Sequence, residues 1–276
     1  MLFRGLLRVA GALALALWLA APGPAQAPEG IAYDELVRSL GAASPPPPGN
    51  FPDDLAGGPP EKGRRAPAGP AGRHLRYAYW NGWERIDDVA AGTATIRKCE
   101  LGQVVRLNLA RKTYTTLAPE QDLATPPPAT GAASAQLDET TVPLANTLFE
   151  GEAANGFATS TAVTIADATG SCKAGKLDIR TEQYLAQRPR PLGAGCPIHD
   201  PAPENAVAYL TTASPGCKLS LSARKAGPVV PNRLSFYSLV TVAGGPSFLT
   251  QRGNLRTLTE ADASRFEIPQ GFTKSP

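Results

Sequence analysis

Residues 75–83 read LRYAYWNGW and give the clearest indication of the fold. Every second residue from Leu75 to Tyr79 is large and apolar or aromatic, a period of two that is typical of a β-strand with one buried face. The Asn-Gly that follows is the dipeptide most typical of a two-residue hairpin turn. We therefore expect an antiparallel hairpin, with Leu75 and Tyr79 on one face of the sheet and Trp80 on the other.

Stretches with the same alternation recur along the rest of the chain, with glycine- and proline-containing turns between them. They lie at residues 104–109, 161–165, 176–180, 207–209, 219–221 and 234–242. About ten short strands with almost no long helical pattern predict a sheet that is curved or packed on itself. We therefore expect a mostly β fold: a curved antiparallel sheet, open half-barrel or sandwich-like, with one or two short helices.

The first 27 residues have the three parts of a secretory signal peptide. Arg4 and Arg8 form the basic start, residues 10–21 are an apolar run, and Ala25-Gln26-Ala27 resembles a cleavage site. The apolar run is shorter than the ~20 residues that a spanning helix needs. We therefore expect residues 1–27 to be cleaved, and the mature protein to be periplasmic or secreted and not membrane-spanning.

Two further stretches are rich in residues that break regular structure. Residues 28–72 contain ten prolines and eight glycines, which predicts an irregular arm. Within it, apolar residues at helical spacing from Tyr33 to Leu40 predict a short helix near 33–40. We expect residues 73–276 to form a β domain and residues 118–146 to be an exposed insertion within it. A second short helical turn is expected at residues 259–264, with Thr259 as its cap.

Four cysteines in an exported protein favour two disulfides, with three possible connectivities. They are Cys99, Cys172, Cys196 and Cys217. Even the closest pair, Cys196 and Cys217, lies far beyond the two-residue spacing typical of zinc sites, so no metal site is expected. Because three of the four lie within 172–217, at least one bridge should form there.

Charge and motif content exclude several classes of function. The net charge is +3, and only +1 once Arg4 and Arg8 are removed, so a charge-driven nucleic-acid partner is not expected. The chain has two histidines and no recognisable catalytic signature. We therefore expect a protein that is not an enzyme and that has no cofactor.

Three aromatic residues are candidates for ligand binding. Trp80 and Trp83 flank the hairpin turn, where they either line a ligand mouth or pack in the core. Phe236 alternates with Leu234, Ser238 and Val240, which places it on the more apolar face of its strand. If that face holds an apolar ligand, a cavity of a few hundred Å³ must remain beside it.

Two segments resemble the periplasmic lipoprotein carrier superfamily, and more closely a set of uncharacterised secreted bacterial proteins related to it. Residues 83–114, with WERID, ATIR, VRL and KTY, are similar to three successive strands of the family. Residues 265–272, RFEIPQGF, are similar to the end of its closing strand. The resemblance implies an open, strongly curved antiparallel sheet whose concave face holds acyl chains under short helices.

Two hypotheses of function follow. The first is a non-enzymatic exported protein that binds an apolar or lipid ligand on its curved sheet. The alternative is a structural or interaction module of the envelope, whose proline-rich arm docks to a protein partner and whose sheet face is a filled core. The resemblance favours the first hypothesis, and the absence of a ligand-specific set of polar residues favours the second.

Overall fold

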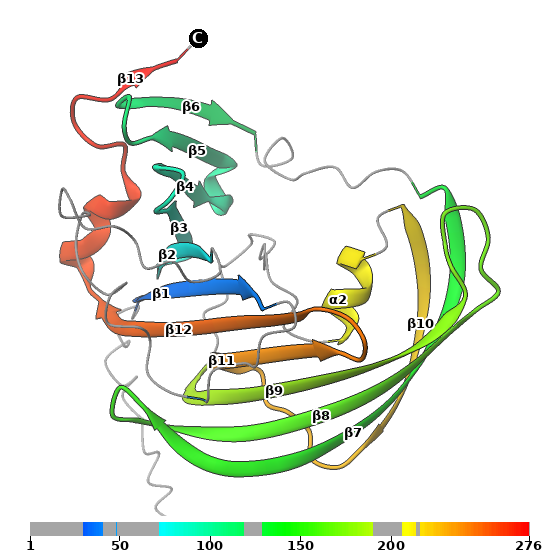
Figure 1. The fold of residues 1–276 in the computed structure, drawn as a ribbon. Coiled ribbons are helices and arrows are strands. Elements are labelled where there is room, and N and C mark those ends of the chain that lie inside the picture. Colours follow the sequence, from blue (N-terminus) through cyan, green and yellow to red (C-terminus); the bar gives the residue numbers. More distant parts are fainter. Residues whose placement is uncertain are drawn as a thin grey trace, which may run out of the picture.

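The fold is described from a computed structural model, which describes residues 30–40, 48, 72–118, 129–189, 206–213 and 216–275. These residues form one sheet of 13 strands in the order β10-β7-β8-β9-β11-β12-β1-β2-β3-β4-β5-β6-β13. Neighbouring strands are antiparallel except at the two ends, where β10 pairs with β7 and β13 with β6 in parallel. The sheet curves round on itself without closing into a barrel (Figure 1). The predicted fold class is confirmed.

The elements have the following bounds. The strands are β1 (Gly30–Ser39), β2 (Arg73–Trp80), β3 (Trp83–Asp88), β4 (Thr93–Lys98), β5 (Gln103–Asn108), β6 (Thr113–Leu117), β7 (Gly131–Phe149), β8 (Glu152–Ala166), β9 (Gly175–Pro189), β10 (Cys217–Ala226), β11 (Arg233–Val242), β12 (Ser247–Leu258) and β13 (Thr273–Lys274). The helices are α2 (Ala206–Ala213) and two 3₁₀ helices, η2 (Cys99–Leu101) and η3 (Glu260–Phe266).

The hairpin predicted from residues 75–83 is formed by β2 and β3. Trp80 and Trp83 are paired directly across its turn. Asn81 and Gly82 both have positive φ, 48° and 76°, as a two-residue turn of this kind requires. Leu75 and its alternating partners Tyr77 and Tyr79 belong to one buried cluster, while Trp80 packs against another. The predicted division of the two faces is therefore correct.

The helix predicted near residues 33–40 is wrong, because these residues belong to β1. This strand lies in the middle of the sheet, paired with β12 on one side and β2 on the other. Both of its faces carry buried side chains, Tyr33 and Glu35 on one and Ala32 and Leu36 on the other. Because side chains on both faces of β1 are buried, its apolar residues do not alternate strictly and fall at a spacing similar to that of a helix. Residues 30–39 are therefore not part of an irregular arm, and residues 41–47 and 49–71 of the predicted arm lie outside the described residues.

The exposed insertion predicted at residues 118–146 is also wrong where the structure describes it. Residues 131–149 form β7, the longest strand, which pairs with β8 on one side and β10 on the other. The buried positions at its start are Ala133, Ala135 and Leu137. Small residues at two of these three positions weakened the alternating pattern. Residues 119–128 lie outside the described residues.

Two predictions of local structure have different outcomes. The helical turn predicted at 259–264 is η3, and the backbone N–H of Thr259 donates a hydrogen bond to the Asp262 carboxylate at 3.1 Å. The strand predicted at 207–209 is wrong, because these residues are part of α2. Figure 1 shows α2 inside the curve of the sheet. The residues wrongly predicted as a strand therefore belong to the helix that covers the concave face.

Candidate binding cavity

The concave face of the sheet is apolar where α2 covers it. Ala206 and Leu210 of α2 join one buried cluster with residues of β7, β8, β9 and β11. The sheet residues in this cluster are Ala135, Leu137, Val163, Ile179, Val240 and Val242. This packing fixes the helix above the sheet. It leaves space beside the start of the helix.

A cavity of about 360 Å³ lies beside α2, between the sheet and the connection from β10 to β11. Its floor is made by β7, β8 and β9, and its other walls by the start of α2 and residues 225–233. The lining from the sheet and the helix consists of Glu139, Thr141, Thr159, Thr161, Thr181, Gln183, Leu185, Ala206, Val207 and Ser235. The volume lies within the range typical of small-molecule sites. A cavity of the expected size is therefore present on the sheet.

Threonine hydroxyl groups dominate the floor of the cavity. Thr141, Thr159 and Thr181 are paired directly across three neighbouring strands, so they point to the same face. The hydroxyl groups of Thr141 and Thr159 are 2.9 Å apart and share a hydrogen bond. Thr161 lies next to this row and is only 3% exposed. The floor therefore offers methyl groups and hydroxyl groups together.

The opposite wall is the β10–β11 connection, which contains Gly-Pro-Val-Val-Pro. Gly227 has φ +90°, and a Cβ atom there would lie 2.0 Å from the Thr141 carbonyl oxygen. Only glycine allows the connection to approach β7 this closely. Val229 is 89% exposed, a large apolar side chain held at the rim of the cavity.

Sequence reasoning missed this site because its residues are small and polar. Thr159 and Thr161 alternate with Ser160 and Ala162 along β8, so the period of two is present in the sequence. The ligand contacts predicted from the sequence were all large aromatic residues. A row of threonines across three strands is visible only once the register is known.

Trp80 and Trp83, predicted as ligand contacts, lie away from this cavity. The two indole rings pack edge to face at 5.6 Å, and Phe266 of η3 lies within 6.3 Å of both. The Lys98 ammonium group lies 4.0 Å from the centre of the Trp83 ring. The structure thus brings the two tryptophans together beneath η3, and their role in binding stays a prediction.

Phe236, the third predicted contact, is 1% exposed and stacks on Phe149 at 5.3 Å. It belongs to a cluster with Tyr237 and Leu239, whereas Val240 belongs to the cluster beneath α2. A bulge between Ser235 and Tyr237 interrupts the alternation on which the choice of Phe236 rested. Phe236 does not line the cavity beside α2, and nothing in the structure tests its predicted role in binding.

One of the expected disulfides is present, between Cys172 and Cys217. It joins the β8–β9 connection to the first residue of β10, and so fixes the edge strand that carries one side of the cavity wall. The predicted bridge within 172–217 is confirmed. Cys196 lies outside the described residues, and so does the side chain of Cys99.

The concave face beyond the cavity is filled by a row of buried polar and aromatic residues. Arg252 donates to Glu35 from Nε at 2.7 Å and from Nη2 at 2.6 Å. The Tyr77 hydroxyl donates to the other Glu35 oxygen at 3.3 Å, and the Tyr33 and Tyr77 rings stack at 5.1 Å. Burial, with the neighbouring Tyr33 and Glu84, raises the pKa of Tyr79 well above its usual value.

Two further features, a metal site and a membrane-spanning helix, bear on the function. Within the described ranges there is no cluster of three or more histidine, cysteine, aspartate or glutamate side chains suited to a metal ion. In the same part of the chain, no helix has the length and apolar character needed to cross a membrane.

No protein-family model matches this chain, and no curated protein sequence matches it either. One similar solved structure is the crystal structure of a domain assigned to outer membrane lipoprotein sorting, from Vibrio parahaemolyticus. It is 11% identical, and the alignment covers 86% of this chain and 89% of that chain with a TM-score of 0.28. A likeness this low carries no inference about the ligand of this protein.

Proposed function

We propose that the protein is a non-enzymatic exported protein that binds an amphiphilic small molecule, such as a single-chain lipid, in the cavity beside α2. The observation that carries this proposal is the mixed lining of the cavity, which combines threonine hydroxyl groups on its floor with apolar side chains of the β10–β11 connection. The charged Glu139, Lys225 and Arg233 also belong to the lining, and Lys225 pairs with Glu139 at 3.2 Å. The signal peptide expected at residues 1–27 supports an exported location.

The chemistry of the two walls favours a ligand with one polar and one apolar part. The Thr161 and Thr181 side chains line the cavity and are only 3% and 4% exposed, and a polar group of the ligand can form hydrogen bonds with their hydroxyl groups. An exposed valine at the rim is stabilised when an apolar chain covers it, at about 25 cal/mol per Å² of buried area. A purely polar ligand leaves Val229 in water.

The envelope interaction module remains the alternative, and a fluorescent fatty-acid analogue separates the two. Dansylaminoundecanoic acid should bind the full mature chain with increased fluorescence, and native mass spectrometry should detect co-purified lipid. Thr159→Phe places a large ring in the cavity, so it should reduce the affinity at least tenfold. Absence of probe binding and of bound lipid, together with a co-purifying protein, supports the interaction module.

Two control variants make this experiment specific. Thr164→Phe introduces the same ring on β8, at an exposed position of the opposite face, and should leave probe binding unchanged. Phe236→Ala should cost about 3–5 kcal/mol of stability, the range for a packed phenylalanine, without reducing probe binding. Equal binding by the Thr159 and Thr164 variants, or loss of probe with Phe236→Ala in folded protein, contradicts the placement of the ligand.

A further inference from the structure

A second cleft, of about 530 Å³, lies on the opposite face of the sheet, where β12, β1, β2 and β3 run side by side. The side chains in its floor are small, because Ala32 and Ala78 are paired directly across β1 and β2. Arg265 of η3 lines one side. Small residues in the floor leave room between the longer side chains around it.

The lining is rich in guanidinium groups. It contains four arginines and two aspartates, namely Arg76, Arg85, Arg256, Arg265, Asp34 and Asp87. The lining therefore has an excess of two positive charges, or of one when Asp262, the partner of Arg265, is included. This concentration of arginine contrasts with a chain whose net charge is only +3.

Two of the arginines are held in place by their neighbours. Arg85 donates from Nε to Asp87 at 2.7 Å and from Nη1 to the carbonyl oxygen of Arg265 at 2.8 Å. Arg265 donates from Nε to Asp262 at 2.8 Å. These bonds orient both guanidinium groups before any ligand arrives, which reduces the entropy lost on binding.

The other two arginines keep donors available. Arg76 is 41% exposed, and its Nε lies 3.5 Å from Asp34, longer than a good hydrogen bond. The Arg256 side chain is exposed and forms no hydrogen bond or ion pair with other described side chains, although its charge acts on the Asp262 carboxylate. Both can therefore turn towards a ligand in the cleft.

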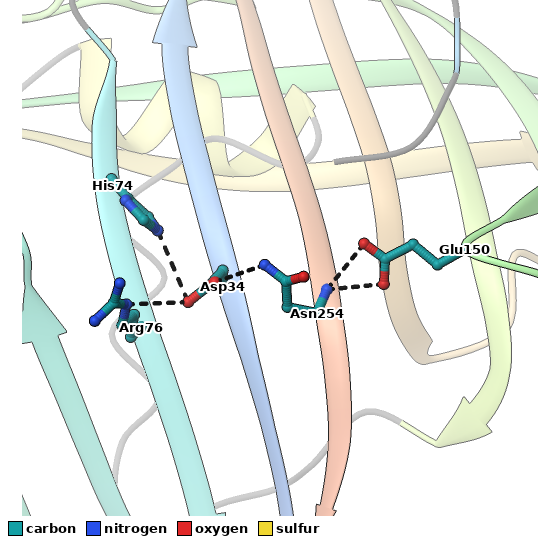
Figure 2. A network of polar contacts seen from close by, with 5 residues as sticks. All are labelled: Asp34, His74, Arg76, Glu150 and Asn254. Carbon is teal, nitrogen blue, oxygen red and sulfur yellow. Dashed lines mark hydrogen bonds and ion pairs between the residues drawn. The ribbon is translucent and has the colours of Figure 1, made fainter. Parts of the chain in front are cut away.

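Asp34 is the acidic group nearest to Arg76, and a network fixes its position (Figure 2). The Asn254 side-chain amide donates to Asp34 at 2.8 Å, and the backbone N–H of Asn254 donates to both oxygens of Glu150, at 3.0 and 2.8 Å. His74 Nε2 lies 3.7 Å from the same carboxylate. Asp34 is therefore held mainly by Asn254, and its contact with Arg76 is longer than a good hydrogen bond.

We propose that this cleft binds a phosphate group, with Arg76 and Arg256 closing on an anion that Arg85 and Arg265 help to orient. Planar guanidinium groups bind phosphate oxygens in pairs, and a phosphate monoester carries between one and two negative charges at neutral pH, which matches the excess charge of the lining. The phosphate belongs either to a phospholipid headgroup or to a free phosphorylated compound. This site is separate from the cavity beside α2, so either proposal can fail alone.

Calorimetric titration of the full mature chain with glycerol 1-phosphate, in 0.15 M NaCl, tests the proposal. The double variant Arg76→Gln/Arg256→Gln should weaken the affinity at least tenfold, because it removes the two arginines with available donors. Arg224→Gln is the matched control, since Arg224 is an exposed arginine of β10 outside the cleft. The control should bind as the unchanged chain does.

Sedimentation with vesicles identifies the source of the phosphate. Binding to vesicles of phosphatidylglycerol that is lost in the double variant assigns the site to a lipid headgroup, whereas binding of glycerol 1-phosphate alone assigns it to a free compound. Both results support the site. The proposal is overturned if neither probe binds the unchanged chain, or if Arg224→Gln weakens binding as much as the double variant does. A circular dichroism spectrum and a urea unfolding midpoint equal to those of the unchanged chain show that the double variant is folded.

Discussion

The buried ion pair between Glu35 and Arg252 gives a quantitative test of the fold. The two residues are directly opposite on β1 and β12, and their side chains are only 1% and 4% exposed. Arg252→Met keeps most of the volume of the side chain and removes its charge. Glu35 then keeps its hydrogen bond from Tyr77 but loses both donors from Arg252.

The expected loss of stability follows from the burial of the remaining charge. Removing one partner of a buried ion pair costs about 3–5 kcal/mol, because the other charge stays buried without compensation. Arg252 also donates from Nη1 to the carbonyl oxygen of Ser235 at 3.1 Å, so the variant loses a bond to the bulge in β11 as well. For a chain of this length, the loss corresponds to a fall in Tm of about 10 °C.

Urea unfolding of the mature protein, with the Cys172–Cys217 disulfide intact, measures this cost. Replacing both partners, as in Glu35→Leu/Arg252→Met, should bring the stability closer to that of the unchanged chain than either single substitution does, because no buried charge remains. A cost below about 1 kcal/mol for Arg252→Met, or a double variant whose loss is the sum of the two single losses, refutes the assignment of a buried, coupled pair.

Two further predictions concern the Cys172–Cys217 disulfide and the polar contacts around Asp34. Replacing Cys172 and Cys217 by serine should cost about 4 kcal/mol in urea unfolding, from the loop-entropy relation for a separation of 45 residues. Burial alone raises the pKa of Asp34, but the contact with His74, the hydrogen bond from Asn254 and the charge of Arg76 hold it below its usual value. Its stabilising effect is therefore present above about pH 4 and lost as the pH falls through the folded-state pKa. Asp34→Asn should remove this part of the acid sensitivity.

The sequence predicted the parts of the fold that depend on local chemistry. The β2–β3 hairpin, its two faces and the η3 turn were predicted because an Asn-Gly turn, a period of two and an Asp near a helix start act within a few residues. The strand β1 was mistaken because its environment is set by β12 and β2, which are distant in sequence. Neither partner can be recognised from residues 30–39 alone.

The candidate site was predicted less well, since it depends on register. Thr141, Thr159 and Thr181 are separated by about twenty residues each, and only the pairing of β7, β8 and β9 places them together. Pairing brought the threonines together, whereas the bulge in β11 removed Phe236 from the face on which alternation placed it. Bulges leave little trace in a single sequence.

Side-chain size explains why the large aromatic residues and the cavity lie in different places. Where the sheet carries Tyr33, Tyr77 and Tyr79, neighbouring rings fill the space between strands and the face becomes a packed core. Across β7 to β9, four of the inward residues that line the cavity are threonines, whose small side chains leave space below the β10–β11 connection. The same curvature thus produces a core where side chains are large and a cavity where they are small. A ligand site on a curved sheet should therefore be sought along its rows of small, polar, inward residues, with the conspicuous aromatic residues expected to form its support.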